Sequence, residues 1–195
     1  IGQAIADKFA QNDYNVIAPG SAELNLDHPE LCEGFVSNLP VIDAFIHCAG
    51  FNKPKAFADI VLADLNKTLN INAVAFYAIA NALVRQGKLK DNGYILGISS
   101  IYGLISRNKR FSYAAAKHCL NGMVKTLALD LAASGIKTNG LAPGFVNTKM
   151  TRQNNDSQTI ANFEKKIPLG RMALPEDIAK IAYFLCSDEN AYING

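Results

Sequence analysis

Residues 94–117 of this 195-residue chain, YILGISSIYGLISRNKRFSYAAAK, contain two segments of different periodicity. Tyr94–Ser99 is nearly continuous in apolar residues, which is typical of a strand covered on both faces of a parallel sheet. The stretch Tyr113–Ala133 has the spacing of a long helix. A buried strand followed by a helix predicts a unit of an α/β fold.

The same alternation continues on both sides of this unit. Further strands are expected at Tyr14–Ala18 and Val41–Cys48. Further helices are expected at the amphipathic N-terminus, at Ala63–Leu83 and at Pro175–Cys186, which begins with proline and two acids. Strands that alternate with helices imply right-handed crossovers and a parallel sheet. The sequence therefore predicts a Rossmann-type, doubly wound α/β/α fold.

The organisation of the chain is expected to be simple, since no internal repeat or linker divides residues 1–195, and we expect one domain. The first helix opens at Ile1-Gly2 without a preceding strand, and Asn190–Gly195 leads toward a further segment. We expect these 195 residues to lack the first and the last strand of the sheet. A polypeptide of these residues alone is expected to be unstable and inactive, because unpaired sheet backbone is costly.

Composition narrows the class of protein. Hydrophobic residues make up 49% of the chain, charged residues 18%, and the net charge is +2 with acids and bases interspersed. This balance predicts a globular protein that binds neither nucleic acid nor membrane. The four cysteines form no CxxC pair, and the chain has no signal peptide, so reduced thiols in a cytoplasmic protein are expected. The histidines lack metal-ligand spacing, so no metal site is proposed.

The candidate chemistry lies in the opening stretch. Tyr113 and Lys117 are four residues apart, which places them on one face of a helix. A nearby ammonium is expected to lower the pKa of the tyrosine and make it a general acid or base. Ser100 ends the strand, where open α/β sheets place their ligands. The Tyr–Lys pair alone is weak evidence for a catalytic site, because such spacing is common on solvated helices.

Other motifs strengthen this interpretation, and together with Ser100, Tyr113 and Lys117 they resemble the short-chain dehydrogenase/reductase family. Cys48-Ala49-Gly50 resembles the end of the family's Asn-Asn-Ala-Gly motif, and Asn72 its helix asparagine. Asn139–Thr148 resembles the family's Pro-Gly segment, and Ile167–Arg171 precedes a stretch like its last helix. Ile1-Gly2 resembles the end of the family's glycine-rich phosphate loop. The similarity is closest to single-domain 3-oxoacyl-acyl-carrier-protein reductases and their sugar-pathway relatives.

The resemblance implies four catalytic residues. Ser100 and Tyr113 would bind the carbonyl oxygen of the substrate, and Tyr113 would give it a proton. Lys117 would lower the pKa of Tyr113 and hold the nicotinamide ribose, and Asn72 would hold a water that connects Lys117 to solvent. The alternative is that Ser100 only caps a helix and Asn72 only turns one.

The resemblance also implies a nicotinamide cofactor. The expected cofactor-binding residues are Gly2, Asn25, Leu26, Cys48, Ala49, Gly50, Tyr113, Lys117, Pro143, Gly144, Val146 and Thr148. Asn25 and Leu26 would read the adenine, although a polar strand end is the alternative. No acid follows the expected strand at Tyr14–Ala18, which favours NADP, and NAD stays possible. Cys48 is interpreted as a packed thiol and His47 as an interior histidine rather than a ligand.

The predicted function is reduction of a carbonyl group, in a 3-oxoacyl thioester or a related keto substrate, to an alcohol. The alternatives are an NAD-dependent alcohol or sugar dehydrogenase running oxidatively, and a nucleotide-binding sensor without chemistry. Lys149–Lys166 is the expected lid. Lys109 and Arg110 are interpreted as solvated surface, with an acidic carrier protein or a phosphate as possible partners. The family's helices imply a homo-oligomer, a dimer or a tetramer.

Overall fold

The computed structural model describes residues 1–195, and its strands form one parallel sheet in the order β1-β2-β3. The strands are β1 (Ile42–His47), β2 (Leu89–Ile98) and β3 (Lys137–Leu141). The α-helices are α1 (Gly2–Ala10), α2 (Cys32–Ser37), α3 (Leu62–Leu69), α4 (Ala75–Arg85), α5 (Phe111–Asp130), α6 (Lys149–Gln153), α7 (Ser157–Lys166) and α8 (Pro175–Leu185). Four short 3₁₀ turns lie at Pro29–Leu31, Phe57–Asp59, Ile101–Gly103 and Ala132–Ser134.

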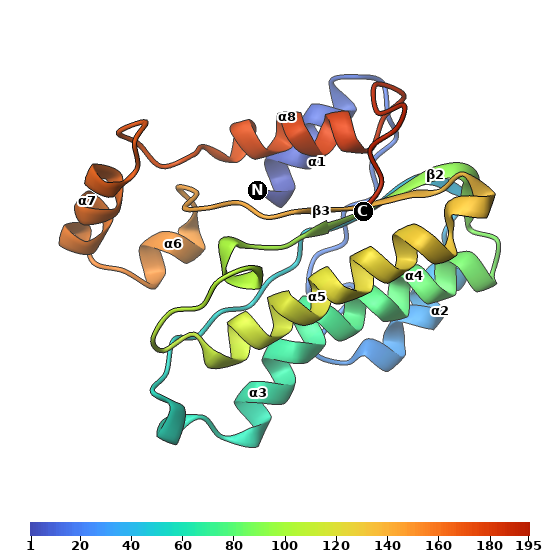
Figure 1. The fold of residues 1–195 in the computed structure, drawn as a ribbon. Helices are drawn as coiled ribbons and strands as arrows, with labels where there is room; N and C mark the ends of the chain where they lie inside the picture. The colour runs from blue at the N-terminus through green and yellow to red at the C-terminus, as the bar shows by residue number, and fades with distance from the viewer.

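Helices cover both faces of the sheet, with α1 and α8 on one side and α2, α3, α4 and α5 on the other (Figure 1). The alternation of side chains along β2 explains this arrangement. Leu96 and Ile98 pack in the cluster beneath α1 and α8, whereas Ile95 packs beneath α4 and α5. Leu96 is fully buried, so each face of the strand is covered, and the predicted doubly wound fold is confirmed.

The predicted helix at Ala63–Leu83 is divided by a π-helical turn at Asn70–Val74. A π-turn widens the helix by one residue and commonly marks a functional site. The predicted helix at Pro175–Cys186 is confirmed as α8, which begins with Pro175 in its first turn. The Asp177 carboxylate accepts a hydrogen bond from the Leu174 amide at 2.9 Å, which caps the first turn.

The strand predicted at Tyr14–Ala18 is wrong. These residues have no regular secondary structure, and Val16 and Ile17 are partly exposed. Their apolar composition fits a strand, but no strand lies beside them to accept their hydrogen bonds, and pairing is what defines a strand. The prediction also missed β3, because Lys137–Leu141 contains lysine, threonine and asparagine rather than an apolar run.

The two edges of the sheet differ. The outer edge of β3 is partly covered by residues 193–195, since the Thr138 amide donates to Asn194 Oδ1 at 2.8 Å and the Gly195 amide to the Thr138 carbonyl at 2.9 Å. The outer edge of β1 has no partner strand. As predicted, no strand precedes α1 or follows α8. None of the helices has the combination of length and apolar composition that crossing a membrane requires.

The turn after β2 depends on a glycine, and its substitution has a predictable cost. A Cβ at Gly103 would lie 2.7 Å from both Asn121 Nδ2 and Ser99 Oγ. We expect Gly103→Ala to lower the free energy of unfolding by about 1–3 kcal/mol, because α5 packs directly on this turn. Urea denaturation of both proteins measures this loss.

Gly122→Ala is the matched control for Gly103→Ala. Gly122 lies within α5, and a Cβ there would meet nothing within 4 Å. Alanine favours a helix interior over glycine by roughly 0.5–1 kcal/mol, so this variant is expected to be slightly more stable than the parent. Equal stability of the two variants would contradict the close approach at Gly103.

Candidate active site

The carboxyl ends of the three strands meet at one edge of the sheet. His47 on β1 lies opposite Gly97 on β2, which in turn lies opposite Gly140 on β3. The segments that follow the strands, 48–50, 99–103 and 142–148, therefore leave the sheet at the same edge. The lid helices α6 and α7 lie at this end of the molecule (Figure 1). Open α/β sheets bind their ligands at this edge.

Ser100 lies immediately after β2 and is 8% exposed. Its hydroxyl oxygen accepts a hydrogen bond from the Tyr102 amide at 3.2 Å, so the serine also caps the 3₁₀ turn Ile101–Gly103. The helix-capping interpretation is therefore correct, and the Ser100 side chain also lies near enough to the Tyr113 hydroxyl to lower its pKa. The predicted Ser100–Tyr113 pair is thus brought together by the turn between β2 and α5.

The ionisation of Tyr113 differs from the expectation. Burial raises its pKa above the ordinary value, and this effect outweighs the hydrogen bond from Ser100 and the positive charge of Arg110, which both lower it. The expected lowering of this pKa by Lys117 is not seen. The Lys117 ammonium lies 5.7 Å from the centre of the Tyr113 ring, and it donates its hydrogen bond to the Ile98 carbonyl instead. Tyr113 is therefore a protonated acid at neutral pH.

Lys117 is 2% exposed, and its ammonium donates to the Ile98 carbonyl at 2.8 Å. Burial lowers the pKa of Lys117 to about 8, because a low-dielectric environment disfavours the charged form. A lysine with such a pKa gains and loses a proton readily near neutral pH. The pair on one face of α5 thus combines a protonated phenol with a more acidic ammonium.

Asn72 lies in the π-turn and is fully buried. Its amide nitrogen donates to the carbonyls of Phe51 and Thr68, both at 2.8 Å, and its Oδ1 accepts from the Phe51 amide at 3.3 Å. Both amide hydrogens are therefore engaged with the protein. The side chain joins the π-turn to the loop after β1, and this contact leaves no side-chain donor for the expected relay water.

His47 is the histidine at the end of β1, and it is 3% exposed. Its Nε2 lies 3.0 Å from the Ile71 carbonyl, which can only accept, so Nε2 carries the proton and donates. Burial, reinforced by the charge of Lys117, lowers the pKa of His47 to about 3. The expectation of a satisfied interior histidine is confirmed, and its partner is the π-turn that carries Asn72.

The pKa of His47 predicts a pH dependence of stability. A histidine whose folded pKa lies below its unfolded value stabilises the fold above pH 6.5, and this contribution is lost as the pH falls towards 3. As the pH falls from 6.5 towards 3, the free energy of unfolding of the parent protein should decrease by up to about 1.4 kcal/mol per pH unit more than that of His47→Asn. Urea denaturation at a series of pH values measures the difference.

The control for this pH dependence is His28→Asn, because the His28 side chain is 58% exposed. This variant should keep the acid sensitivity of the parent protein. If His47→Asn and the parent protein lost stability in parallel below pH 6.5, His47 would not be held neutral by burial.

Several predicted cofactor residues line the edge where the strands end. Gly2 lies against Cys48, since a Cβ on the glycine would be 3.5 Å from the sulfur. Ala49 and Gly50 follow directly, and a Cβ at Gly144 would meet nothing within 4 Å. Small residues at these positions leave backbone open to a ligand. Burial raises the pKa of the Cys48 thiol, as expected of a packed cysteine.

The segment after β3 forms the other side of this edge. Pro143 accepts a hydrogen bond from the Ile101 amide at 2.9 Å, which joins it to the serine turn. Val146 is buried and forms a bridge with Ala173. The Thr148 hydroxyl caps α6 by accepting from the Thr151 amide at 3.3 Å, so it is engaged with the lid.

Asn25 and Leu26 are separated from this group. Asn25 is exposed and its Oδ1 accepts from the Asp27 amide at 3.1 Å, whereas Leu26 packs against the core beneath α4. The side chain of Leu26 therefore points away from a cofactor. The structure adds Glu23, whose carboxylate accepts from the Gly20 amide at 2.8 Å. Its position about 20 residues after Gly2 was a signal for a ribose-binding acid that the sequence prediction missed.

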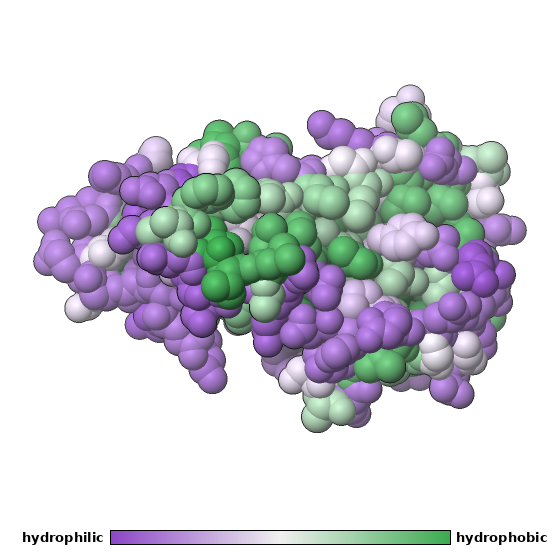
Figure 2. Space-filling model, turned by 90° about the horizontal axis from the view of Figure 1, so that it is seen from below, coloured by the Kyte–Doolittle hydropathy of each residue, from purple (hydrophilic) through white to green (hydrophobic).

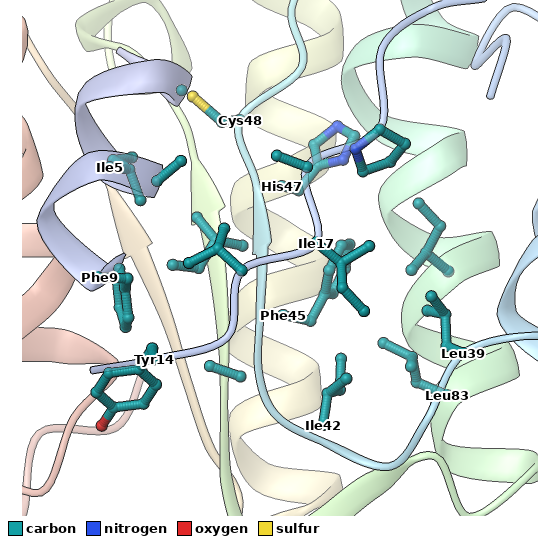
Figure 3. Close-up of a pocket in the computed structure, with 18 of the residues that line it drawn as sticks. Ile5, Phe9, Tyr14, Ile17, Leu39, Ile42, Phe45, His47, Cys48 and Leu83 are labelled. Carbon is teal, nitrogen blue, oxygen red and sulfur yellow. The ribbon is translucent and has the colours of Figure 1, made fainter. Parts of the chain in front are cut away.

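A cavity of about 720 Å³ runs along the unpaired edge of β1 (Figure 3). Its lining is mostly apolar, from Ile5 and Phe9 of α1 across to Leu83 of α4, and His47 and Cys48 lie at one end. The apolar lining does not match a polar dinucleotide. We therefore place the catalytic crevice at the strand ends rather than in this cavity.

The interpretation of Lys109 and Arg110 as solvated surface is wrong for one of the two. Lys109 is exposed, but Arg110 is only 8% exposed. Its Nη1 donates to Asn52 Oδ1 at 3.2 Å, and its guanidinium lies 5.9 Å from the centre of the Tyr102 ring. No sequence pattern predicts this burial, since the residue lies in a polar loop.

Comparisons with known proteins identify relatives of this chain. A family profile described as enoyl-(acyl carrier protein) reductase matches residues 25–195. The 3-oxoacyl-[acyl-carrier-protein] reductase FabG of Rickettsia felis is 34% identical over 213 aligned residues, which span 100% of this chain and 88% of the relative.

Solved structures show the same fold. A short chain dehydrogenase family protein from Francisella tularensis superimposes with a TM-score of 0.87 at 23% identity, over 99% of this chain and 89% of the other. The structure of ElxO with NADP bound superimposes with a TM-score of 0.85 at 25% identity, with the same coverage of 99% and 89%.

Proposed function

Because this chain belongs to the short-chain dehydrogenase/reductase family, we propose that it reduces a carbonyl group to an alcohol with a nicotinamide cofactor. The observation that carries the proposal is the meeting of Ser100, Tyr113 and Lys117 at the carboxyl edge of the sheet. The Tyr113 phenol lies near the Ser100 side chain, which lowers its pKa, and a buried ammonium lies on the same helix face. The π-turn with Asn72 borders the same crevice.

The proposed chemistry uses the protonation states of these groups. When bound, the reduced nicotinamide supplies a hydride for the carbonyl carbon. Ser100 and Tyr113 hold the carbonyl oxygen, and Tyr113 gives its proton to that oxygen as the alcohol forms. Lys117, whose pKa is about 8, can return a proton to the Tyr113 phenolate. The raised pKa of Tyr113 keeps the phenol protonated at neutral pH and favours its reprotonation by Lys117.

The same raised pKa distinguishes reduction from the oxidative alternative. An alcohol dehydrogenase needs Tyr113 as a phenolate base, and burial disfavours the phenolate. A sensor without chemistry has no use for a proton donor paired with a buried lysine. We therefore propose reduction, in which the protonated phenol acts as the acid.

We propose NADP as the cofactor, with NAD as the alternative. Gly144 offers open backbone, with Gly2, Cys48 and Gly50 across the same edge of the sheet, and Tyr113 and Lys117 would hold the nicotinamide ribose. ElxO, at 25% identity, was solved with NADP bound. Glu23 is exposed, and its carboxylate accepts from the Gly20 amide. The proposal of NADP requires that this carboxylate does not bind the ribose 2′-hydroxyl, because an acid there favours NAD and repels a 2′-phosphate.

The substrate class proposed from the relatives is a 3-oxoacyl thioester or a related keto compound. The FabG protein of Rickettsia felis is named a 3-oxoacyl-[acyl-carrier-protein] reductase, and its similarity spans the whole of this chain. The lid α6–α7 closes the substrate side of the crevice, through the Asn154 amide group that donates to the Asn52 carbonyl at 3.0 Å.

We also propose a homo-oligomer in the cytoplasm. Hydrophobic residues gather over the middle of the face formed by α3, α4 and α5 (Figure 2). Leu62, Tyr77 and Val84 are among the exposed residues of this face. Apolar patches of this kind mark protein interfaces. All four cysteines are free, which supports a reducing compartment.

The experiment that tests this function is a titration of the protein with NADPH and with NADH, followed by nicotinamide fluorescence. The cofactor that binds more tightly is then mixed with acetoacetyl-N-acetylcysteamine, a neutral 3-oxoacyl thioester, and oxidation of the cofactor is followed. We expect tighter binding of NADPH and oxidation that depends on the thioester. Glu23→Gln should weaken NADH more than NADPH if this carboxylate contacts the ribose. Failure of both cofactors to bind would overturn the proposal.

A further inference from the structure

Arg110 is a buried charge without a counter-ion. It is 8% exposed, and none of the six ion pairs of the chain includes it. Its one hydrogen bond to a side chain, at 3.2 Å to Asn52 Oδ1, goes to a neutral amide. A guanidinium cannot lose its proton, so burial cannot be relieved by neutralisation. An uncompensated buried charge costs several kcal/mol in general, which makes an anionic partner the expected solution.

The position of Arg110 is on the substrate side of the catalytic crevice. It precedes α5 and lies three residues, about one helical turn, before Tyr113. Its guanidinium lies over the ring of Tyr102, which packs edge-on against Tyr113 with 6.4 Å between ring centres. Asn52, its hydrogen-bond partner, is in turn held by the lid through Asn154. Arg110 thus lies between the proton donor and the lid.

Arg110 forms no ion pair, and the three loop segments beside it contain no acid, while Asp59 and Asp156 directly follow two of them. Residues 50–58, 99–112 and 145–155, which form the loop after β1, the turn before α5 and the start of the lid, have neither aspartate nor glutamate. Their basic residues besides Arg110 are Lys53, Lys55, Arg107, Lys109, Lys149 and Arg152. In addition, α5 begins with no side-chain cap and no acid in its first turn. Helix N-termini of this kind attract anions.

From these observations we propose that Arg110 binds an acid group, a carboxylate or a phosphate, of an oxo substrate whose carbonyl is reduced at Tyr113. This inference rests on the proposed carbonyl reduction and narrows its substrate. It favours a small anionic oxo compound over a neutral oxoacyl thioester. Arg110 and the start of α5 orient the acid group, so the carbonyl is presented to Ser100 and Tyr113.

Two matched pairs of substrates test the proposal. Acetoacetate is compared with methyl acetoacetate, and dihydroxyacetone phosphate with dihydroxyacetone, so each pair differs in one charged group. Arg110→Met should lower kcat/KM for the charged member of the preferred pair by roughly 10- to 100-fold and leave the neutral member within about twofold. The pair that responds identifies the acid group as a carboxylate or a phosphate. Equal effects on both members of each pair, or none, would overturn the proposal.

Arg107→Gln is the control for charge. It removes one positive charge from the same loop, and Arg107 is exposed. Its guanidinium lies 3.5 Å from the Tyr102 hydroxyl and 5.2 Å from the centre of the Phe163 ring in α7. Its effects on charged and neutral substrates should stay within about threefold of the parent protein, since exposed charges act mainly through screened, long-range attraction. A loss as large as that of Arg110→Met would mean that general charge, and not a site, is responsible.

A binding measurement decides the case even if none of the four compounds is turned over. Inorganic phosphate and acetate are added to the parent protein and to Arg110→Met in a chloride-poor buffer, and thermal unfolding is followed. The midpoint temperature of unfolding of the parent protein should rise by about 2–4 °C with one of the anions, and that of the variant should not rise. The variant should also be at least as stable as the parent without anions. Equal shifts in both proteins, no shift in either, or a variant destabilised without anions would overturn the proposal.

The two proposals fail in distinguishable ways. Failure of carbonyl reduction appears as loss of cofactor binding or as no Tyr113-dependent turnover of any substrate. Failure of the Arg110 site appears as Tyr113-dependent turnover in which charged and neutral substrates respond alike to Arg110→Met.

Discussion

Tyr113→Phe should lower kcat by about 10²- to 10⁴-fold while the affinity for the nicotinamide cofactor changes little. The variant keeps the ring, which is mostly buried beside Tyr102, and removes only the hydroxyl that lies near Ser100. The loss therefore falls on proton donation and not on the fold. Steady-state rates with acetoacetyl-N-acetylcysteamine, together with cofactor fluorescence, measure the two quantities separately.

Tyr102→Phe is the matched control for this prediction. The Tyr102 ring is buried next to Tyr113, but its hydroxyl contacts only Arg107, at 3.5 Å. Its kcat should stay within a fewfold of the parent value. A Tyr113→Phe protein with full kcat would show that the proton comes from elsewhere, and it would favour the non-catalytic sensor.

Lys117→Met should stabilise the protein at pH 7 while it abolishes measurable turnover. Burial lowers the pKa of Lys117 from 10.5 to about 8, so the charged lysine is costly in the folded state below pH 8. This cost is on the order of 3 kcal/mol. Methionine removes it, but leaves the Ile98 carbonyl without a donor, an offset of about 1 kcal/mol. The expected net gain in the free energy of unfolding is about 2 kcal/mol.

The sign of the pH dependence makes this prediction specific. The folded pKa of Lys117 lies below its unfolded value, so between pH 8 and 10.5 the unfolded chain binds more protons and the parent protein gains stability with pH. The advantage of Lys117→Met should therefore be full at pH 7 and shrink as the pH rises through this window. Urea denaturation at pH 7, 9 and 10.5 measures it.

Lys125→Met provides the comparison on the same helix. Lys125 is exposed on α5, so its replacement should change the free energy of unfolding by less than about 0.5 kcal/mol at every pH. If Lys117→Met were less stable than the parent protein at pH 7, the ammonium would contribute to the fold and not only to the site.

These opposite effects on stability and activity express one property of the site. Lys117 and Arg110 are each more than nine-tenths buried, and neither forms an ion pair. Charges placed in this way are expensive for folding and are retained where a ligand or a reaction uses them.

The sequence by itself determined the part of the fold whose signals are local. The apolar run of β2, the helical spacing of α5 and the proline and acids that begin α8 predicted these elements, because periodicity and capping act over a few residues. The spacing of Ser100, Tyr113 and Lys117 followed from the same βα unit. The motifs then placed Cys48–Gly50 and Asn72 beside them.

Only the tertiary structure decided the features that depend on neighbours distant in the chain. Tyr14–Ala18 has the composition of a strand but no partner, whereas the more polar β3 pairs with β2. Pairing is therefore the deciding interaction, and it is not local. Desolvation is not local either. It raises the pKa of Tyr113 against the expectation and buries Arg110 in a loop of polar residues, because both depend on the packing of loop, turn and lid around one edge of the sheet.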